Sequence, residues 1–186
     1  MKSTLAKRKN VLSRLFLALS ALCAPGAAFA QSPPGALPVV PSVDLQRYMG
    51  RWYEIARLPA WFERSCASDA TARYTLQSDG TIRVVNECRR ADGSRKVAQG
   101  IARKASSHGP NSKLKVRFFW PFSGDYWILD LDPQYGWVLV GEPSRKYLWI
   151  LARKPKLDST VYARLVDRAR SEGFDTASLI VTRQTP

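Results

Sequence analysis

Few residues of this 186-residue chain could support acid–base or nucleophilic catalysis. His108 is the only histidine, and it stands in the Ser/Gly/Pro/Asn-rich stretch 106–112, which predicts an exposed loop. A Ser-His-Asp triad would need this histidine, and no G-x-S-x-G motif accompanies it. Asp130 and Asp132 could share one face of a strand, but Asp132 precedes Pro133 and is typical of a turn. These residues do not predict an enzyme.

Glu54 and the cysteines are the other candidates for chemistry. Glu54 lies in a predicted strand, and a buried carboxylate there would need a partner such as Arg57 or Tyr48. Cys66 leads into one predicted strand and Cys88 ends the next, so we expect a disulfide between them, with two buried free thiols as the alternative. One histidine with two paired cysteines has no recognisable metal-site spacing, so we predict no metal and no cofactor.

The elements that position these residues are short strands separated by turn signals such as Ser78-Asp79-Gly80. The predicted strands are 51–58, 69–77, 81–89, 95–104, 113–119, 125–131, 137–141 and 147–153, with a last short candidate at 179–182. Closure removes the edges of sequential antiparallel strands. We therefore predict an all-β, eight-stranded antiparallel up-and-down barrel, wide enough for one small ligand. A β-sandwich is the alternative from the pattern alone.

Two helical segments and a leader flank the strands. Residues 43–49 can form a short helical turn. Asp158 predicts the N-cap of a helix that runs to about Glu172 and ends at Gly173. Its apolar residues share one face, so this helix should pack against the outside of the barrel. Residues 31–42 contain four prolines and predict an extended, mobile leader.

Residues 1–30 have the organisation of a secretory signal peptide. Five basic residues and no acidic one precede a short apolar run, and Ala28-Phe29-Ala30 supplies the cleavage site. We therefore expect export to the periplasm, with residues 43–186 forming one domain. The alternatives are an uncleaved N-terminal anchor and an outer-membrane lipoprotein acylated at Cys23, although Leu22 stands where such a signal normally has a small residue.

The mature chain is strongly basic. Without the five basic residues of 1–30 it keeps 24 basic and 15 acidic residues, a net charge of +9. Such a surface favours anionic partners, including an anionic membrane surface, while the simplest interpretation is a solvated exterior. The basic residues are spread along many segments and form no stripe, so we expect no nucleic-acid partner.

Three stretches resemble the signature regions of the lipocalin family. The first, 49–59, contains the family's G-x-W and closely resembles the WYEIARLP of its bacterial and plant subgroup. The second, 124–130, resembles the T-D-Y region with Gly124 in place of threonine. The third, 147–153, resembles the last barrel strand with its closing arginine. The resemblance covers essentially the whole mature domain and implies a barrel that binds a small hydrophobic molecule.

The resemblance gives Gly50, Trp52 and Arg153 structural roles in closing one end of the barrel. Gly50 permits a tight turn where a larger residue would clash. Trp52 plugs the closed end, and Arg153 lies over its indole, where a cation contributes about 0.5–2 kcal/mol. None of the three is assigned to ligand chemistry.

The ligand site of such a barrel is its interior, lined by alternate residues of each strand. On the last strand, two aliphatic residues suit the face under the C-terminal helix, which turns Tyr147 and Trp149 inward. On the strand 125–131 the parity is open, so either Tyr126 or Trp127 faces the ligand. Ordinary core packing is the alternative for these aromatic residues.

The densest aromatic cluster comprises Phe118, Phe119, Trp120 and Phe122. We favour packing at a strand end for this cluster. The alternative is a lip at the open end that guides a lipid or touches a membrane.

We predict a binding protein that is not an enzyme. The leading hypothesis is storage or transport of a fatty acid or lysophospholipid in the cell envelope, because each buried CH₂ contributes about 0.8 kcal/mol. The alternatives are an interaction protein that docks on a membrane and, less favoured, a small enzyme of the lipocalin type. The sequence leaves the identity of the ligand and the oligomeric state open.

Overall fold

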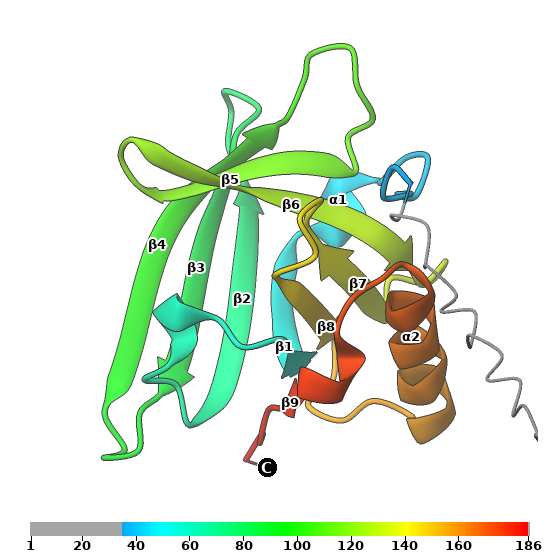
Figure 1. The fold of residues 1–186 in the computed structure, drawn as a ribbon. Coiled ribbons are helices and arrows are strands. Elements are labelled where there is room, and N and C mark those ends of the chain that lie inside the picture. The colour runs from blue at the N-terminus through cyan, green and yellow to red at the C-terminus, as the bar shows by residue number, and fades with distance from the viewer. Residues whose placement is uncertain (1–34, 186) are drawn as a thin grey trace, which may run out of the picture. The chain divides into compact units, whose positions relative to one another are not determined.

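The computed structural model describes residues 35–185, so the predicted signal peptide, Cys23 and the start of the leader lie outside the described residues. The barrel strands are β1 (Gly50–Arg57), β2 (Ser68–Leu76), β3 (Ile82–Arg89), β4 (Arg95–Lys104), β5 (Lys113–Phe119), β6 (Phe122–Leu131), β7 (Trp137–Gly141) and β8 (Leu148–Ala152). From β1 to β8 each strand pairs antiparallel with the next, and β1 also pairs with β8, which closes the predicted eight-stranded barrel (Figure 1).

The alternation of side chains along the strands produces two hydrophobic clusters. Residues of one parity meet inside the barrel, around Trp52, Tyr74 and Ile128. Residues of the other parity, such as Leu139 and Leu148, form an outer cluster between the strands and the C-terminal helix. The strand-pattern alternative, a β-sandwich, is therefore excluded by the closed pairing.

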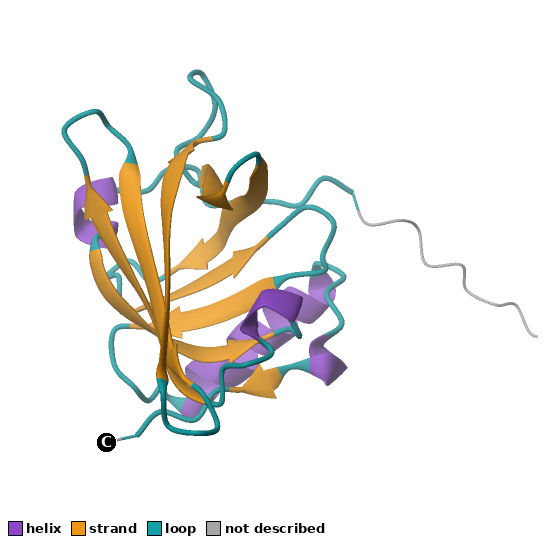
Figure 2. Ribbon diagram, turned by 90° about the vertical axis from the view of Figure 1, so that its left-hand side faces the viewer, coloured by secondary structure: helices purple, strands orange, loops and turns teal. Residues whose placement is uncertain are grey.

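The helix α2 (Ser159–Ser171) packs on the outside of the barrel, as predicted (Figures 1 and 2). The Asp158 carboxylate accepts two backbone N–H groups of the first turn and caps the helix. Gly173, with φ +87°, supplies the left-handed residue that ends it. Its buried residues, Leu165 and Ala169, lie in the outer cluster. No helix within residues 35–185 is both long and apolar enough to cross a membrane.

The described part of the leader corrects one expectation. Leu37 is only 4% exposed and packs in the outer cluster. The Val40 N–H donates to the Ile128 carbonyl at 3.0 Å, and the Ser112 hydroxyl donates to the Val40 carbonyl at 2.6 Å. The prediction of a mobile leader over 31–42 is wrong for this part, because the apolar residues between the prolines bury themselves against the barrel.

One end of the barrel is closed by α1 (Leu45–Tyr48) and Trp52. Trp52 is fully buried, and its Nε1–H donates to the Tyr48 carbonyl at 2.9 Å. The Arg153 guanidinium lies 3.9 Å from the centre of the Trp52 ring and donates to three backbone carbonyls. Gly50 has φ +96°, and a Cβ there would lie 3.3 Å from the Arg153 Nη1. This is the arrangement that the resemblance implies.

At the opposite, open end the C-terminal segment fills a seam between two strands. The strand β1 pairs with β2 only from Gly50 to Tyr53. Its C-terminal residues Ala56 and Arg57 pair instead with β9 (Ile180–Val181). The Asp69 N–H then donates to the Arg183 carbonyl at 2.8 Å, which joins this segment to β2. Two single-turn 3₁₀ helices complete the fold: η1 (Trp61–Glu63) at the open end and η2 (Thr176–Ser178) before β9.

Candidate functional site

The open end leads into a cavity of about 980 Å³ inside the barrel. This volume lies at the upper end of the range for small-molecule pockets. Aliphatic side chains from the inner faces of several strands, including Ala72, Val84, Val116 and Leu151, form much of its wall. Such a space can enclose an apolar molecule that enters from the open end.

Tyr74 and Tyr126 line the cavity toward its closed end, and the fully buried Tyr48 lies between them and Trp52. The Tyr126 hydroxyl lies 2.7 Å from that of Tyr48 and 2.9 Å from that of Tyr74. Burial raises the pKa of Tyr74 to about 12 and the pKa values of Tyr48 and Tyr126 well above their usual range. All three phenols are therefore protonated at neutral pH and satisfy one another in a hydrogen-bonded chain. This end of the cavity is polar at the hydroxyls and apolar at the rings.

The structure places the four predicted lining residues on two faces. Tyr126, Tyr147 and Trp149 line the cavity, and the rings of Tyr147 and Trp149 stack at 6.0 Å. Trp127 faces the opposite way and packs in the outer cluster, with the Lys113 ammonium 3.9 Å from its ring centre. A ligand-facing Trp127 is therefore ruled out, because neighbouring residues of a strand point to opposite faces and Tyr126 takes the inner position.

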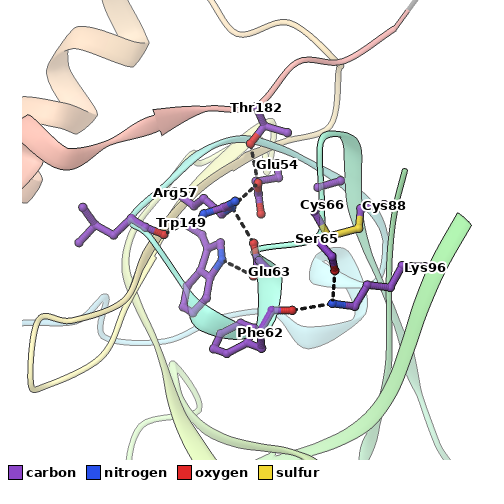
Figure 3. Close-up of polar contacts among 12 residues, drawn as sticks. Glu54, Arg57, Phe62, Glu63, Ser65, Cys66, Cys88, Lys96, Trp149 and Thr182 are labelled. Carbon is purple, nitrogen blue, oxygen red and sulfur yellow. Dashed lines mark hydrogen bonds and ion pairs between the residues drawn. A yellow bond between two sulfur atoms is a disulfide. The ribbon is translucent and has the colours of Figure 1, made fainter. Parts of the chain in front are cut away.

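An ion-pair network holds η1 beside the cavity (Figure 3). The Arg57 Nε lies 2.9 Å from a Glu63 carboxylate oxygen and 3.4 Å from a Glu54 oxygen. The Trp149 indole N–H donates to the other oxygen of Glu63 at 3.1 Å. This contact joins η1 to a residue of the cavity wall.

Glu54 is the protonated member of this network. Burial, and next the charge of Glu63, raise the pKa of Glu54 to about 8, although a hydrogen bond from the Thr182 hydroxyl and the charge of Arg57 act in the opposite direction. Of the two partners suggested by the sequence, Arg57 is the one that Glu54 meets, while the Tyr48 hydroxyl is bound to tyrosine. At neutral pH the Arg57 charge is therefore balanced by Glu63.

A second set of contacts ties the segment after η1 to β3 and β4. The expected disulfide between Cys66 and Cys88 is present, with their Cα atoms 5.6 Å apart. The Lys96 ammonium, opposite Cys88 in the strand register, donates to the Phe62 carbonyl at 2.7 Å and to the Ser65 hydroxyl at 2.9 Å. The β1–β2 connection is thus held on both sides of the cavity mouth.

The aromatic cluster at the β5–β6 turn is exposed. Trp120 is 81% and Phe122 is 68% exposed, and Phe119 packs edge-on against Phe122. The favoured expectation of packing at a strand end is wrong for Phe119, Trp120 and Phe122, whereas Phe118 is only 36% exposed and lies against Gly100. Trp61 of η1 is also exposed, and it lines the same cavity as Phe119 and Phe122.

Residues 43–184 match the profile of the lipocalin-like domain family. The chain belongs to the lipocalin family. This lipocalin is 44% identical over 154 residues to temperature-induced lipocalin-1 of Arabidopsis thaliana, a match that covers 79% of this chain and 82% of the relative. It is 40% identical over 155 residues to the outer membrane lipoprotein Blc of Escherichia coli K12, covering 82% and 86%. Apolipoprotein D of Macaca fascicularis is 35% identical over 182 residues, covering 91% and 95%.

Solved structures show the same fold. The lipocalin superposes on insecticyanin of the tobacco hornworm Manduca sexta with a TM-score of 0.66 and 20% identity, covering 82% of this chain and 86% of the other. Lobster apocrustacyanin A1 gives a TM-score of 0.63 and 14% identity, covering 84% and 94%. At such identities the likeness concerns the fold alone.

Sequence reasoning missed several polar residues around the cavity of this lipocalin, among them Glu63, Lys96 and Asn86. A signal for two of them was available. Asn86 has the same parity as Val84 in its strand, and Lys96 has the same parity as Ala98, so each polar residue interrupts the inward-facing series. Within residues 35–185, no group of three or more His, Cys, Asp or Glu side chains could hold a metal ion.

Proposed function

We propose that this lipocalin binds one single-chain lipid, a fatty acid or a lysophospholipid, in the barrel interior and stores or carries it in the cell envelope. The observation that carries the proposal is the cavity of about 980 Å³, closed at the Trp52 end and open at the other. A hydrocarbon tail in this space exchanges water for aliphatic and aromatic walls, and each buried CH₂ contributes about 0.8 kcal/mol.

The acidic side chains near the cavity are bound to structural partners, which supports a carrier and not an enzyme. Glu54 and Glu63 share Arg57, and Asp125 pairs with Lys115 at 2.9 Å. His108 lies exposed in the β4–β5 loop, at the closed end of the barrel. The acids are thus held by structural partners, and the histidine lies at the opposite end from the cavity mouth.

The envelope location rests on two observations. Residues 1–30 have the organisation of a secretory signal peptide, which would deliver the protein to the periplasm. The relatives named outer membrane lipoprotein Blc come from Escherichia coli and Vibrio cholerae, the latter 36% identical over 153 residues. Anchoring through Cys23 is the alternative to a free periplasmic protein, and the intact mass of protein extracted from envelopes distinguishes the two.

The test is ligand binding by the delipidated protein with one matched pair of variants on β4. Ala98 lines the cavity, whereas its neighbour Val97 points outward and is exposed. Ala98→Trp should place an indole in the path of the tail and weaken binding of a long-chain fatty acid by more than about tenfold, and Val97→Trp should leave the affinity unchanged. Titration of the intrinsic tryptophan fluorescence measures both. Equal affinities for the two variants, or no binding by the parent protein, would contradict the proposal.

The rim of the open end supports a second candidate function, docking on an anionic membrane. Trp61, Trp120 and Phe122 are exposed there and can enter the interfacial layer of a bilayer. Basic residues lie at the same end of the strands. Each Lys or Arg near an anionic surface contributes about 1 kcal/mol to the free energy of membrane binding. These basic residues are Arg64, Arg90, Lys96, Arg145 and Lys146, while Arg89 and Arg95 at the same end pair with Asp69 and Glu87.

Vesicle co-sedimentation tests the docking. Trp120→Ser with Phe122→Ser should reduce binding to phosphatidylglycerol-containing vesicles about tenfold, because the exposed rings lose their apolar contact. Ile101→Ser is the control, since Ile101 is exposed on β4 near the closed end. Added salt should weaken binding of the parent protein. Docking is refuted if the double variant sediments with these vesicles as well as the control does.

A further inference from the structure

Two cations that line the mouth of the cavity, Lys96 and Arg64, have only neutral partners. The Lys96 ammonium donates to the Phe62 carbonyl and the Ser65 hydroxyl, at 2.7 and 2.9 Å. The Arg64 Nε–H donates to the Trp61 carbonyl at 3.0 Å. Among residues 35–185, no carboxylate lies within salt-bridge distance of either cation.

The acids that line the same cavity are already bound elsewhere. Each is held by another cation, by a hydroxyl group or by backbone N–H groups. The pairs are Glu63 with Arg57, Glu87 with Arg95, Asp125 with Lys115, Glu54 with Thr182, and Glu142 with the backbone of residues 144, 146 and 147. Glu54 is protonated, and among these acids Glu142 alone keeps its charge without a cationic partner, so Lys96 and Arg64 leave one positive charge in excess at the cavity mouth. The apolar walls strengthen the attraction of this charge for an anion.

The Lys96 ammonium is held in a fixed direction with one donor to spare. An ammonium group has three N–H donors, and Phe62 and Ser65 accept two of them. Both acceptors belong to the β1–β2 connection, which the Cys66–Cys88 disulfide ties down beside Lys96. The third donor has no partner within residues 35–185 and is available to a ligand, since Lys96 lines the cavity.

Asn86 provides a second polar group next to Lys96. Its Oδ1 is buried and has no hydrogen-bond partner, and its side chain lines the cavity. Asn86 pairs with Ala98 in the register, so Asn86 and Lys96 are diagonal neighbours on the inner face. The backbones of such neighbours are about 7 Å apart, which long side chains can span. The amide group of the Asn86 side chain carries an N–H₂ donor, which an anionic acceptor in the cavity can use.

We propose that Lys96, with Asn86 beside it, binds the anionic head group of a single-chain lipid, a carboxylate or a phosphate, whose tail extends toward Tyr126. The inference rests on the proposed lipid-binding function and adds to it the chemistry and the direction of the ligand. The head group lies at the mouth against the spare N–H of Lys96, and the hydrocarbon tail lies along the aliphatic wall.

The test compares myristic acid with myristyl alcohol, which has the same tail and no charge, by fluorescence titration of the mature, disulfide-bonded protein. Lys96→Met should weaken binding of the acid about tenfold, the effect of one charge-assisted hydrogen bond, and leave binding of the alcohol unchanged. Lys96→Arg should retain the preference for the acid. Lys104→Met, an exposed change near the end of the same strand that does not line the cavity, is the matched control.

The remaining outcomes separate this proposal from the general one. Equal losses for acid and alcohol in Lys96→Met would mean that Lys96 only supports the mouth, and would overturn the head-group site. Binding of neither ligand by the parent protein would overturn the lipid-binding function itself. A third titration with myristoyl lysophosphatidate identifies the anion: the ligand that loses more affinity in Lys96→Met carries the preferred head group, and a loss for neither refutes the site.

Discussion

The two ends of the barrel contain the same residue types in opposite states. At the closed end Trp52 is fully buried, its N–H is bound, and Arg153 covers its ring and donates to three carbonyls. At the open end Trp120 is solvent-exposed, and Lys96 and Arg64 have only neutral partners. Tryptophan and basic residues thus stabilise one end and remain available at the other.

The contrast shows how one barrel combines a stable core with a binding surface. The closed end satisfies its polar groups internally, so its contacts favour folding. The open end holds a protonated Glu54 beside Glu63 and Arg57, an unpartnered Asn86 and exposed rings, which cost stability. Unfavourable features of this kind cluster at functional sites.

Replacing one tryptophan at each end gives the largest expected difference. Trp52→Ala should lower the free energy of unfolding by about 3–5 kcal/mol, because it leaves a cavity beneath Tyr48 and exposes Arg153. Trp120→Ala should change it by less than about 0.5 kcal/mol, since its ring is in solvent. Urea denaturation measures both. Arg153→Met, which keeps Trp52 but uncovers its ring, should fall between them, and similar values for all three variants would remove the distinction between the ends.

The disulfide is the exception that stabilises the open end. Cys66 and Cys88 are 22 residues apart, and opening a loop of this length should cost about 3 kcal/mol. We expect Cys66→Ser with Cys88→Ser to show this loss in urea denaturation. The parent protein with its disulfide reduced should show the same loss, which provides the control. A loss below about 1 kcal/mol would show that Lys96 and the ion pairs suffice to hold the segment.

The pH dependence of stability sharpens the comparison through Glu54 at the open end. Burial raises the pKa of Glu54 from an ordinary value of 4.5 to about 8, so the folded protein keeps a proton that the unfolded chain loses between these values. The free energy of unfolding should therefore fall as the pH rises from about 4.5 to 8 and level off above 8, where both states are ionised.

Glu54→Gln removes this proton exchange while keeping the side-chain shape. Relative to the parent, the variant should gain more than about 1 kcal/mol in stability between pH 5 and 8. Asp167→Asn, at an exposed helix position, should retain the parent's slope. Parallel pH profiles for Glu54→Gln and the parent protein would show that Glu54 is not the group responsible.

Much of the framework could be predicted from local patterns. The strands 95–104, 113–119 and 137–141 coincide with β4, β5 and β7, because turn residues bound each alternating run. The N-cap at Asp158 was also evident, since it depends on adjacent residues only. The start of β6 at Phe122 was not, because an aromatic–proline stretch has no clear alternation from which to extend the strand.

The composition of the candidate site was only partly predictable. Tyr147 and Trp149 follow from the helix-facing parity of β8, whereas Tyr126 and Trp127 could not be separated without the register of β6. The ion pair between Glu63 and Arg57 was not predictable, because the path of the β1–β2 connection that carries Glu63 depends on the disulfide and on Lys96.

The sequence by itself determined the number of strands, the outer position of the C-terminal helix and the lipocalin resemblance, because these depend on side-chain period, caps and short motifs that act over a few residues. Only the tertiary structure decided which of Tyr126 and Trp127 faces the cavity, where the leader packs, and which charges lack a counter-ion. Those properties depend on residues that are far apart in the chain and meet only when the barrel closes. Lys96 and Asn86 show this most clearly, since neither is unusual until the cavity surrounds it.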